Sequence, residues 1–325
     1  MRAAAATHNP AMDTRVFERL AALPDTARAT LAVVVGVEGS AYRRPGATRL
    51  LLPDGTTEGL VSGGCLEHDI AARSTGDAGQ LVRYDLRAGD QLPWGLPSGC
   101  AGVVEIWLQP IPPGRPSPYR MAARWLAAGH HIRVVTVLTS GEQWAVAESD
   151  PALRCGRPRS LKADEHAFVD LREPTPRLVV FGRGPDADAV AWLGGRLGFD
   201  IARSPRDVAP TALLLPRRPA AAVVMGHDFA TDRAAVLAAL AAGVPYVGVL
   251  GPRDRTARML PPPWPAALHA PVGLDLGADG PEEIALAILG ELLAVRRGTA
   301  AGFLRDRHGP IHPRAAAAEA EAAGD

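Results

Sequence analysis

The chain has little cysteine. It carries three thiols in 325 residues, at Cys65, Cys100 and Cys155, and so small and odd a number argues against a disulfide framework. It also lacks an apolar run of the ~20 residues that a membrane helix needs. The N-terminal alanines run into Pro10 without the strongly apolar core of a signal peptide. These absences predict a cytoplasmic protein with reduced thiols and no membrane segment.

Net charge is absent as well. Lys and Arg together number 35, as do Asp and Glu, so the excess of positive charge that a nucleic-acid-binding surface needs is missing. Lys162 is the only lysine. We interpret the arginine excess mostly as compositional bias, although an individual arginine makes a good bidentate clamp for phosphate or carboxylate.

Hydrophobic residues make up 47% of the chain, which is enough for two cores. The length of the chain favours two domains.

The first part of the chain predicts a mixed α/β module. Residues 30–52 predict a strand, a Gly- and Pro-containing loop and a second strand. Residues 59–64 predict a short third strand that ends in two glycines, and residues 65–74 a helix with acids in its first turn. Further strands are expected over 81–86 and 103–110.

This module continues with a predicted helix over 120–128 and a hairpin formed by residues 131–138 and 143–148. Residues 150–176 are rich in Pro, Arg and charge and show little periodicity. We place the domain boundary near Pro174-Thr175-Pro176.

Beyond that boundary strands alternate with helices, as in residues 177–199 and 220–243, and a well-marked helix over 281–298 follows. Such alternation predicts a Rossmann-like, doubly wound parallel sheet. The expected organisation is a disordered N-terminus over residues 1–13 and an N-terminal domain over 14–174. A Rossmann-like C-terminal domain is expected over 175–312 and a disordered tail over 313–325.

A Gly-rich turn follows the first strand of the second domain. Gly182 and Gly184 fit the G-x-G-x-x-A pattern, which lets the backbone approach a pyrophosphate at a helix N-terminus. Pro185 removes one amide donor from that cradle. The turn therefore predicts a phosphate-bearing ligand more strongly than a redox role for NAD.

The end of the next strand departs from the nucleotide-binding pattern. Ser204 stands where an acid would bind ribose hydroxyls, and its neighbours Arg203 and Arg206 suit a phosphate better. His227 and Asp228 end a later strand, on the side where doubly wound sheets bind ligands. Asp228 is equally well interpreted as a helix N-cap.

Cys65 and Cys100 both lie in Gly-rich turns beside predicted strands. A small thiol is often simply buried, but such turns are also where functional groups gather. Cys65 follows Gly63 and Gly64 at a predicted helix start, a position that favours the thiolate. The chain has no C-x-x-C pair, which argues against a structural zinc site, and Cys155 looks incidental.

A basic loop lies between the first two predicted strands. Arg43 and Arg44 precede Pro45 and Gly46 there. The pair has two interpretations: a solvated turn, or two guanidinium groups that grip a phosphate or the oxygens of a pterin.

Long stretches of the chain resemble the XdhC/CoxI family of accessory factors for xanthine dehydrogenase and carbon monoxide dehydrogenase. The stretch GSAYRRPGATRLLLPDGTTEGLVSGGCLEHDI is similar to the family's N-terminal module, and GLPSGCAGVVEIWLQP to its second signature. VVMGHDFATD, YVGVLGPRDRTARML and PVGLDLGADGPEEIALAILGELLAVRRG resemble its C-terminal Rossmann-like module. The resemblance runs collinearly from Thr30 to Gly298.

The resemblance implies a carrier and maturation factor for the molybdenum cofactor, molybdopterin, rather than a turnover enzyme. Such a protein protects the cofactor while a cysteine desulfurase supplies its sulfido ligand, hands it to a molybdenum hydroxylase, and forms a homodimer. Cys65 and Cys100 would contact molybdenum or its sulfur. The cofactor-binding positions that follow are Arg43, Arg44, Gly63, Gly64, Cys65, Glu67, Cys100, Gly182 and Gly184, to which our own interpretation adds His227 and Asp228.

Three positions depart from the family pattern. Tyr42 stands where proline is usual, Ser204 replaces the acid, and Pro252 follows Gly251 where serine is common. The last two weaken a nucleotide-specific inference for the second module. Two alternatives stay open: an NAD(P)-dependent oxidoreductase that uses the Rossmann-like domain, and an interaction scaffold without a small ligand.

Overall fold

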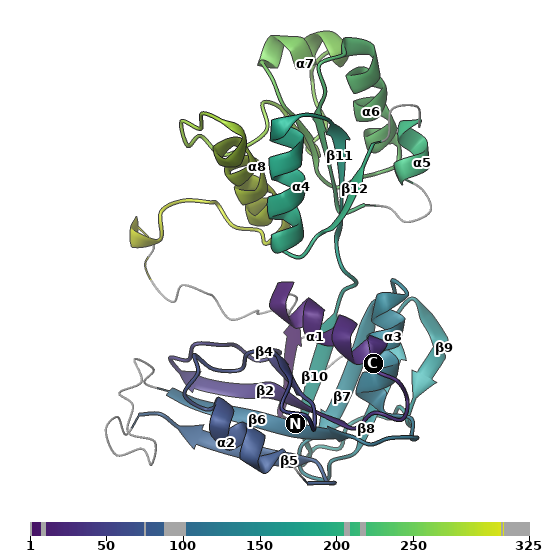
Figure 1. The fold of residues 1–325 in the computed structure, drawn as a ribbon, viewed down its shortest axis with the longest axis vertical. Helices are drawn as coiled ribbons and strands as arrows, with labels where there is room; N and C mark the ends of the chain where they lie inside the picture. Colours follow the sequence, from purple (N-terminus) through teal and green to yellow (C-terminus); the bar gives the residue numbers. More distant parts are fainter. Residues whose placement is uncertain are drawn as a thin grey trace. The chain divides into compact units, whose positions relative to one another are not determined.

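The computed structural model describes residues 2–7, 11–74, 76–87, 102–204, 209–214, 219–306 and 308. The chain divides between Pro174 and Thr175 into two compact units (Figure 1), which we call unit 1 and unit 2 and describe separately. No helix of the described residues is long and apolar enough to cross a membrane.

Unit 1 contains two five-stranded sheets. The first has the order β4-β3-β2-β6-β5 and is antiparallel throughout. Its strands are β2 (Ala29–Gly39), β3 (Thr48–Leu51), β4 (Thr57–Gly59), β5 (Gln80–Asp85) and β6 (Gly102–Ile111). The expected strand over 59–64 is wrong, because β4 ends at Gly59 and side chains of the following turn bind the backbone donors that a ladder would use.

The second sheet has the order β1-β10-β7-β8-β9. Its strands are β1 (Arg2–Thr7), β7 (Ile132–Val137), β8 (Gln143–Ala147), β9 (Asp150–Cys155) and β10 (His166–Arg172). β1 pairs in parallel with β10, and the other neighbours are antiparallel.

Two stretches of this sheet differ from the sequence analysis. Residues 1–13 were expected to be disordered, but they include β1 and the start of α1, since edge pairing needs backbone groups rather than large side chains. The low periodicity of residues 150–176 gave no sign of strands, but the stretch contains β9 and β10. The expected tail, 313–325, lies outside the described residues.

Three helices pack on these sheets: α1 (Ala11–Ala22), α2 (Glu67–Arg73) and α3 (Pro118–Ala127). The main core joins α1 and α3 to one face of each sheet, with Phe17 and Tyr119 among its fully buried side chains. On the other face of the first sheet, Leu66 and Ile70 pack at the start of and within α2. The turn that precedes α2 is therefore fastened to a core.

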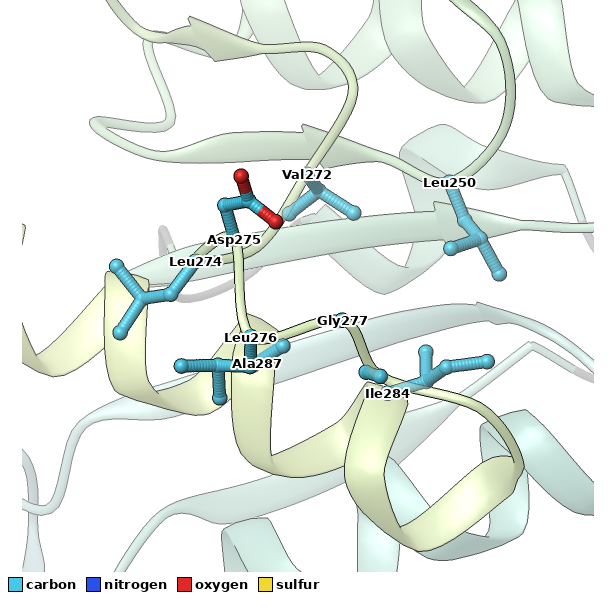
Figure 2. Close-up of a pocket in the computed structure, with 9 residues that line it drawn as sticks. Leu250, Val272, Leu274, Asp275, Leu276, Gly277, Ile284 and Ala287 are labelled. Carbon is cyan, nitrogen blue, oxygen red and sulfur yellow. The ribbon is translucent and has the colours of Figure 1, made fainter.

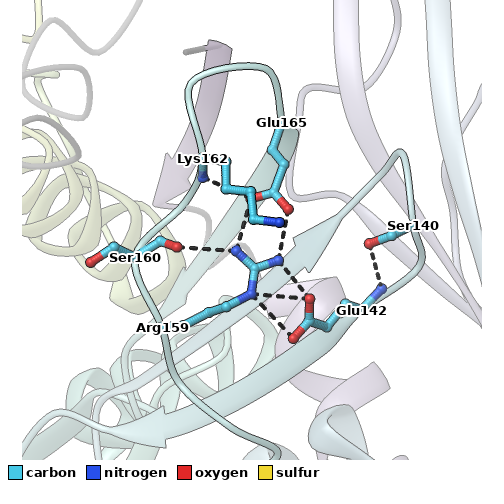
Figure 3. A network of polar contacts seen from close by, with 6 residues as sticks. All are labelled: Ser140, Glu142, Arg159, Ser160, Lys162 and Glu165. Carbon is cyan, nitrogen blue, oxygen red and sulfur yellow. Dashed lines mark hydrogen bonds and ion pairs between the residues drawn. The ribbon is translucent and has the colours of Figure 1, made fainter.

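A charged cluster holds the segment between β9 and β10 (Figure 3). Arg159 donates to the carboxylates of Glu142, in the β7–β8 turn, and of Glu165. Its guanidinium group also lies 5.6 Å from the ring centre of Trp144. The hydrogen bonds from Arg159 lower the pKa of Glu165 to about 2.

Unit 2 is built on one parallel sheet of order β12-β11-β13-β14-β15. Successive residues of a strand face opposite sides, so β11 and β13, which are apolar along most of their length, contribute side chains to the cores on both faces. The strands are β11 (Arg177–Gly182), β12 (Asp200–Arg203), β13 (Ala221–Met225), β14 (Val247–Val249) and β15 (Leu268–His269).

Helices cover both faces of this sheet. α4 (Pro185–Arg196) and α8 (Pro281–Arg296) share one core with it, and α5 (Pro210–Leu214) and α6 (Phe229–Ala241) share the other. α7 (Arg253–Met259) follows β14. The predicted α/β fold, with a mixed first unit and a doubly wound second one, is confirmed.

Candidate functional site

The segment that joins β4 to α2 forms a closed turn around Ser62 and Glu67. Ser62 Oγ accepts hydrogen bonds from the backbone N–H of Gly64 at 3.1 Å and of Leu66 at 3.2 Å, and it donates to Glu67. The Glu67 carboxylate also accepts from the backbone N–H of Ser62 at 3.1 Å and of Leu66 at 3.2 Å. These bonds fix the turn, which we call the cysteine turn, residues 62–67.

Glu67 is thus engaged inside the turn. Its Oε1 lies 3.7 Å from Arg49 Nη1, and both side chains are about seven-eighths buried, with 12% and 13% of their surface exposed. The structure therefore gives Glu67 a positioning role, and direct contact with a cofactor stays a prediction. Sequence reasoning overlooked Ser62 and Arg49, although a serine five residues before a glutamate at a helix start was a usable signal.

The two glycines of the turn serve different needs. Gly64 has φ +112°, in the region that glycine tolerates best, and a side chain there would meet no described atom within 4 Å. A Cβ on Gly63 would lie 3.6 Å from Cγ of Tyr42. Both glycines are exposed. Gly64 therefore leaves one side of the turn open, while the Tyr42 ring covers the other.

Cys65 is half-buried beside this opening. Its Sγ lies 3.8 Å from Ser62 Oγ, and the side chain packs partly against the core beneath α2. It stands two residues before Glu67, where α2 begins, so it precedes the helix rather than occupying its first turn. Cys100, the expected second thiol, lies outside the described residues, and whether the two sulfurs share a pocket stays a prediction.

Arg43 has a buried partner. Its Nη2 donates to Asp13 Oδ2 at 2.7 Å, and the same carboxylate accepts from the backbone N–H of Thr48 at 2.6 Å and from its hydroxyl at 2.8 Å. Asp13 is fully buried, and 16% of the Arg43 side chain is exposed. Arg43 therefore anchors its loop to α1, and Arg44 is the exposed member of the pair.

A second buried arginine supports the same loop from β10. Arg172 donates to the backbone carbonyl of Gly46 at 2.6 Å and to Asp170 at 3.0 Å, and it lies 4.2 Å from the ring centre of Phe17. The loop over 40–47 is therefore held at Arg43 and at Gly46 by charged side chains inside the protein. Sequence reasoning missed this because the partners come from distant parts of the chain.

In unit 2 the strand order places a switch point between β11 and β13. Chain connections run in opposite directions from β11, and ligands of open α/β sheets bind at the carboxyl ends of strands beside such a point. Gly182 ends β11 and Gly184 lies in the loop after it, and Gly226 to Asp228 follow β13. The predicted residues of unit 2 therefore lie on neighbouring loops at one sheet edge.

Gly182 and Gly184 differ in the space around them. A Cβ on Gly182 would lie 2.6 Å from Cγ and 2.9 Å from the carbonyl oxygen of Met225, so β13 needs a residue without a side chain there. Gly184 has φ +88° and precedes α4, and a Cβ on it would meet no described atom within 4 Å. Gly184, not Gly182, is the residue that leaves space for a ligand.

Asp228 caps α6. Its carboxylate accepts a hydrogen bond from the backbone N–H of Thr231 at 2.7 Å, and the hydroxyl and N–H of Thr231 lower the pKa of Asp228. His227 is exposed beside it. Of the two interpretations of Asp228, the structure supports the cap, whereas His227 stays available at the switch point.

A pocket of about 310 Å³ lies beyond the end of β14 (Figure 2). Aliphatic side chains form most of its wall, among them Leu250, Val272, Leu274 and Ile284, and Asp275 adds a carboxylate. A wall of this kind suits an apolar group and disfavours phosphate. Sequence reasoning did not single it out.

Among the described residues, no three His, Cys, Asp or Glu side chains are grouped so as to hold a metal ion.

Comparison with known proteins agrees with both units. The family model described as the XdhC and CoxI family matches residues 23–85, and the one described as the XdhC Rossmann domain matches residues 178–292. A Bacillus subtilis protein described as a probable xanthine dehydrogenase subunit is 31% identical to this chain over 319 residues, and the match covers 86% of this chain and 97% of that protein.

Two further relatives cover most of the chain. A molybdenum cofactor insertion chaperone of Escherichia coli, PaoD, is 27% identical over 87% of this chain and 89% of its own length. A crystal structure of a protein described as a xanthine dehydrogenase from Bacillus halodurans matches with a TM-score of 0.75 and 29% identity, covering 90% of this chain and 98% of that one. From these matches and the two-unit fold, the chain belongs to the XdhC/CoxI family.

Proposed function

We propose that this protein binds the molybdenum cofactor and delivers it to a molybdenum hydroxylase. The observation that carries the proposal is the cysteine turn, where the half-buried Cys65 thiol stands beside the open side of Gly64 on a backbone fixed by internal hydrogen bonds. The match to a relative named as a molybdenum cofactor insertion chaperone supports it.

The residues present fit this cofactor. A thiol suits a group with soft metal and sulfur chemistry, and Gly64 admits a bulky ligand close to the backbone. Nε of Arg43 and Nε of Arg49 are buried without a hydrogen-bond partner among the described residues, and guanidinium N–H groups suit an anionic ligand. When bound, the cofactor supplies the molybdenum and its sulfur ligands; the protein binds, orients and shields it.

The proposal extends to the partners that this role requires. The client is a molybdenum hydroxylase such as xanthine or carbon monoxide dehydrogenase, and a cysteine desulfurase provides the sulfido ligand while the cofactor is held. A fixed turn serves such a carrier, because a preorganised site loses little conformational entropy on binding. The carrier role also explains why a thiol is kept half-covered rather than fully exposed to oxidants.

Cofactor occupancy of two cysteine variants tests the proposal. Protein produced together with the cofactor is purified anaerobically, and its pterin is released by acid, oxidised and measured by fluorescence. Cys65→Ser should lower occupancy at an unchanged melting temperature, because serine is close in size but a far poorer ligand for soft metal and sulfur chemistry.

Cys155→Ser is the matched control. Cys155 is also half-buried, but burial raises the pKa of its thiol, and its side chain packs against the main core of unit 1. Occupancy should stay at the level of the unchanged protein. Absence of pterin from the unchanged protein would contradict the carrier role. Full cofactor occupancy in Cys65→Ser would show that the Cys65 thiol is not needed to bind the cofactor.

A second ligand is proposed for unit 2. The open Gly184, at the start of α4 and next to the switch point, favours a phosphate-bearing group such as a nucleotide. Titration with NADH and NADPH, followed by anisotropy, tests this, with Gly184→Val as the variant that should lose binding. Hydride transfer to an aldehyde or quinone acceptor would instead favour the oxidoreductase alternative.

We propose that the homodimer forms through α4 and α8, which lie side by side (Figure 1). Trp192 of α4 is 67% exposed and Leu286 of α8 is 55% exposed. α8 carries Glu282 and Glu283 in its first turn and Arg296 in its last. When two copies of α8 pack antiparallel about a two-fold axis, the acidic end of each meets the basic end of the other.

Light scattering after gel filtration tests this interface. Leu286→Arg should convert a dimer into a monomer, because it places a charge in the centre of the apolar contact. Leu276→Arg is the control, since Leu276 is 53% exposed but lies in the loop before α8. A monomeric unchanged protein, or a dimeric Leu286→Arg variant, would rule this interface out.

A further inference from the structure

Tyr42 presents an aromatic ring against the cysteine turn. A methyl group on Gly63 would lie 3.6 Å from Cγ, 3.7 Å from Cδ2 and 3.9 Å from Cδ1 of that ring. The ring therefore faces the side of Gly63 from which a side chain would project. It belongs to the loop between β2 and β3, whereas Gly63 belongs to the turn between β4 and α2. Two separate segments thus meet at this ring.

The ring is also unusually open to solvent. Tyr42 is 65% exposed, and among the described residues of unit 1 the only other large apolar side chain with substantial exposure is Leu81, at 37%. An exposed tyrosine ring offers a ligand a large apolar face and keeps its polar tip in water.

The backbone that carries Tyr42 is held in place. The next residue, Arg43, is tied to the buried Asp13, and Gly46 donates to the carbonyl of Val34 at 2.7 Å. A ring on an anchored loop loses little conformational entropy when a ligand stacks on it. A Cβ on Gly64, the residue after Gly63, would meet no described atom within 4 Å. The ring therefore lies against Gly63, and the open Gly64 and the half-buried Cys65 are the next two residues of the same turn.

We propose that Tyr42 is the stacking platform for the flat pterin ring of the cofactor. This inference rests on the proposed cofactor-carrier function and assigns one further residue to it. Stacking of a heterocycle on one aromatic side chain changes affinity by about tenfold. Tyr42 then sets the orientation of the pterin, and Cys65 stands on the same turn for the sulfur-bearing part of the ligand.

The experiment measures binding of a fluorescent pterin, pterin-6-carboxylate, to the full chain by anisotropy, and records the quenching of its emission by stacking. Tyr42→Phe should bind within about twofold of the unchanged protein, since the ring is retained. Tyr42→Ala should bind about tenfold more weakly and lose the quenching. Leu81→Ala, the control on β5, should change neither.

The melting temperature checks that folding is intact, because a side chain this exposed contributes little to stability. Equal affinity and equal quenching in Tyr42→Ala would overturn the platform while leaving the carrier function standing, as judged by the cofactor that copurifies with the protein. No binding of the probe to the unchanged protein would also overturn the platform. Absence of copurified cofactor is a separate result that bears on the carrier function.

Discussion

Removal of the Glu67 carboxylate is the sharpest test of how the cysteine turn is built. In Glu67→Ala the backbone N–H and the hydroxyl of Ser62 lose their acceptor, whereas the N–H of Leu66 keeps Ser62 Oγ. Hydrogen bonds to a charged group are worth ~1.5–3 kcal/mol each, and at a site with residual exposure the lower end applies. Two lost bonds therefore predict a destabilisation of about 3 kcal/mol.

For a unit of this size, that loss corresponds to a fall in melting temperature of roughly 6–12 °C. The assay is thermal unfolding of the full chain, with amide hydrogen exchange at residues 62–66 to assign the loss to the turn. Glu67→Gln keeps one oxygen acceptor, but its amide nitrogen cannot accept the bonds made to the other carboxylate oxygen, and the ion pair with Arg49 is lost. Its effect should therefore be smaller than that of Glu67→Ala but still measurable.

His68→Ala is the matched control. His68 is exposed on the first turn of α2, and its removal should change the free energy of unfolding by less than about 0.5 kcal/mol. The reasoning would be refuted if Glu67→Ala kept both its melting temperature and its exchange protection at residues 62–66. In that case the turn would be held by the packing of α2 rather than by its internal hydrogen bonds.

Three further substitutions probe other parts of the structure. Gly182→Ala should destabilise unit 2 by about 1–3 kcal/mol in urea unfolding, because its methyl group would collide with Met225; unchanged stability would contradict the crowding. Arg159 lowers the pKa of Glu165 to about 2, so the Glu165 carboxylate stabilises the folded state above its ordinary value near pH 4.5 and this contribution fades as the pH falls toward 2. Between pH 5 and 3 the free energy of unfolding of Glu165→Gln should therefore fall less steeply than that of the unchanged protein. An equally steep fall in both would count against the ion pair between Arg159 and Glu165. Asp13→Ala should cost about 3–5 kcal/mol, because it leaves a buried arginine without its counter-charge, and a melting curve like that of the unchanged protein would argue against this buried pair.

The alternation of strand and helix in unit 2 could be predicted because it is written in local patterns. Apolar runs such as 177–182 and 221–225 end at glycines and are followed by helical periodicity. The helix from Pro281 to Arg296 has acids in its first turn and an arginine in its last turn, as the helix dipole favours, and a glycine follows where the helix ends. These signals act over a few residues and need no knowledge of distant partners.

The sequence also identified the segment that the candidate site occupies. Two glycines, a cysteine and a glutamate before a helix marked the turn, and the resemblance to the XdhC/CoxI family rested largely on that stretch. The sequence did not show which glycines are required by packing and which leave space.

In unit 2, Gly182 and Gly184 fitted one motif, but β13 leaves no room for a side chain at Gly182, whereas the space around Gly184 is open. This difference depends on which strand lies next to each glycine.

Long-range charge pairing was decided only by the tertiary structure. Asp13 lies in a stretch expected to be disordered, yet it is fully buried against Arg43 and Thr48. The parallel pairing of β1 with β10 joins segments separated by most of unit 1. A buried carboxylate is tolerated only when donors from elsewhere surround it, and no local pattern announces which distant residues will supply them.

The sequence by itself therefore determined the residue types at the site, the helix and strand pattern of unit 2, and the family. The tertiary structure decided which of those residues are engaged and which are open. Glu67 and Arg43 proved to hold the protein's own backbone and side chains, whereas Gly64, which precedes Cys65, and the ring of Tyr42 remain exposed. The physical reason is that hydrogen-bond partners and contacts are properties of residues brought together in space, and the chain order carries only their chemistry.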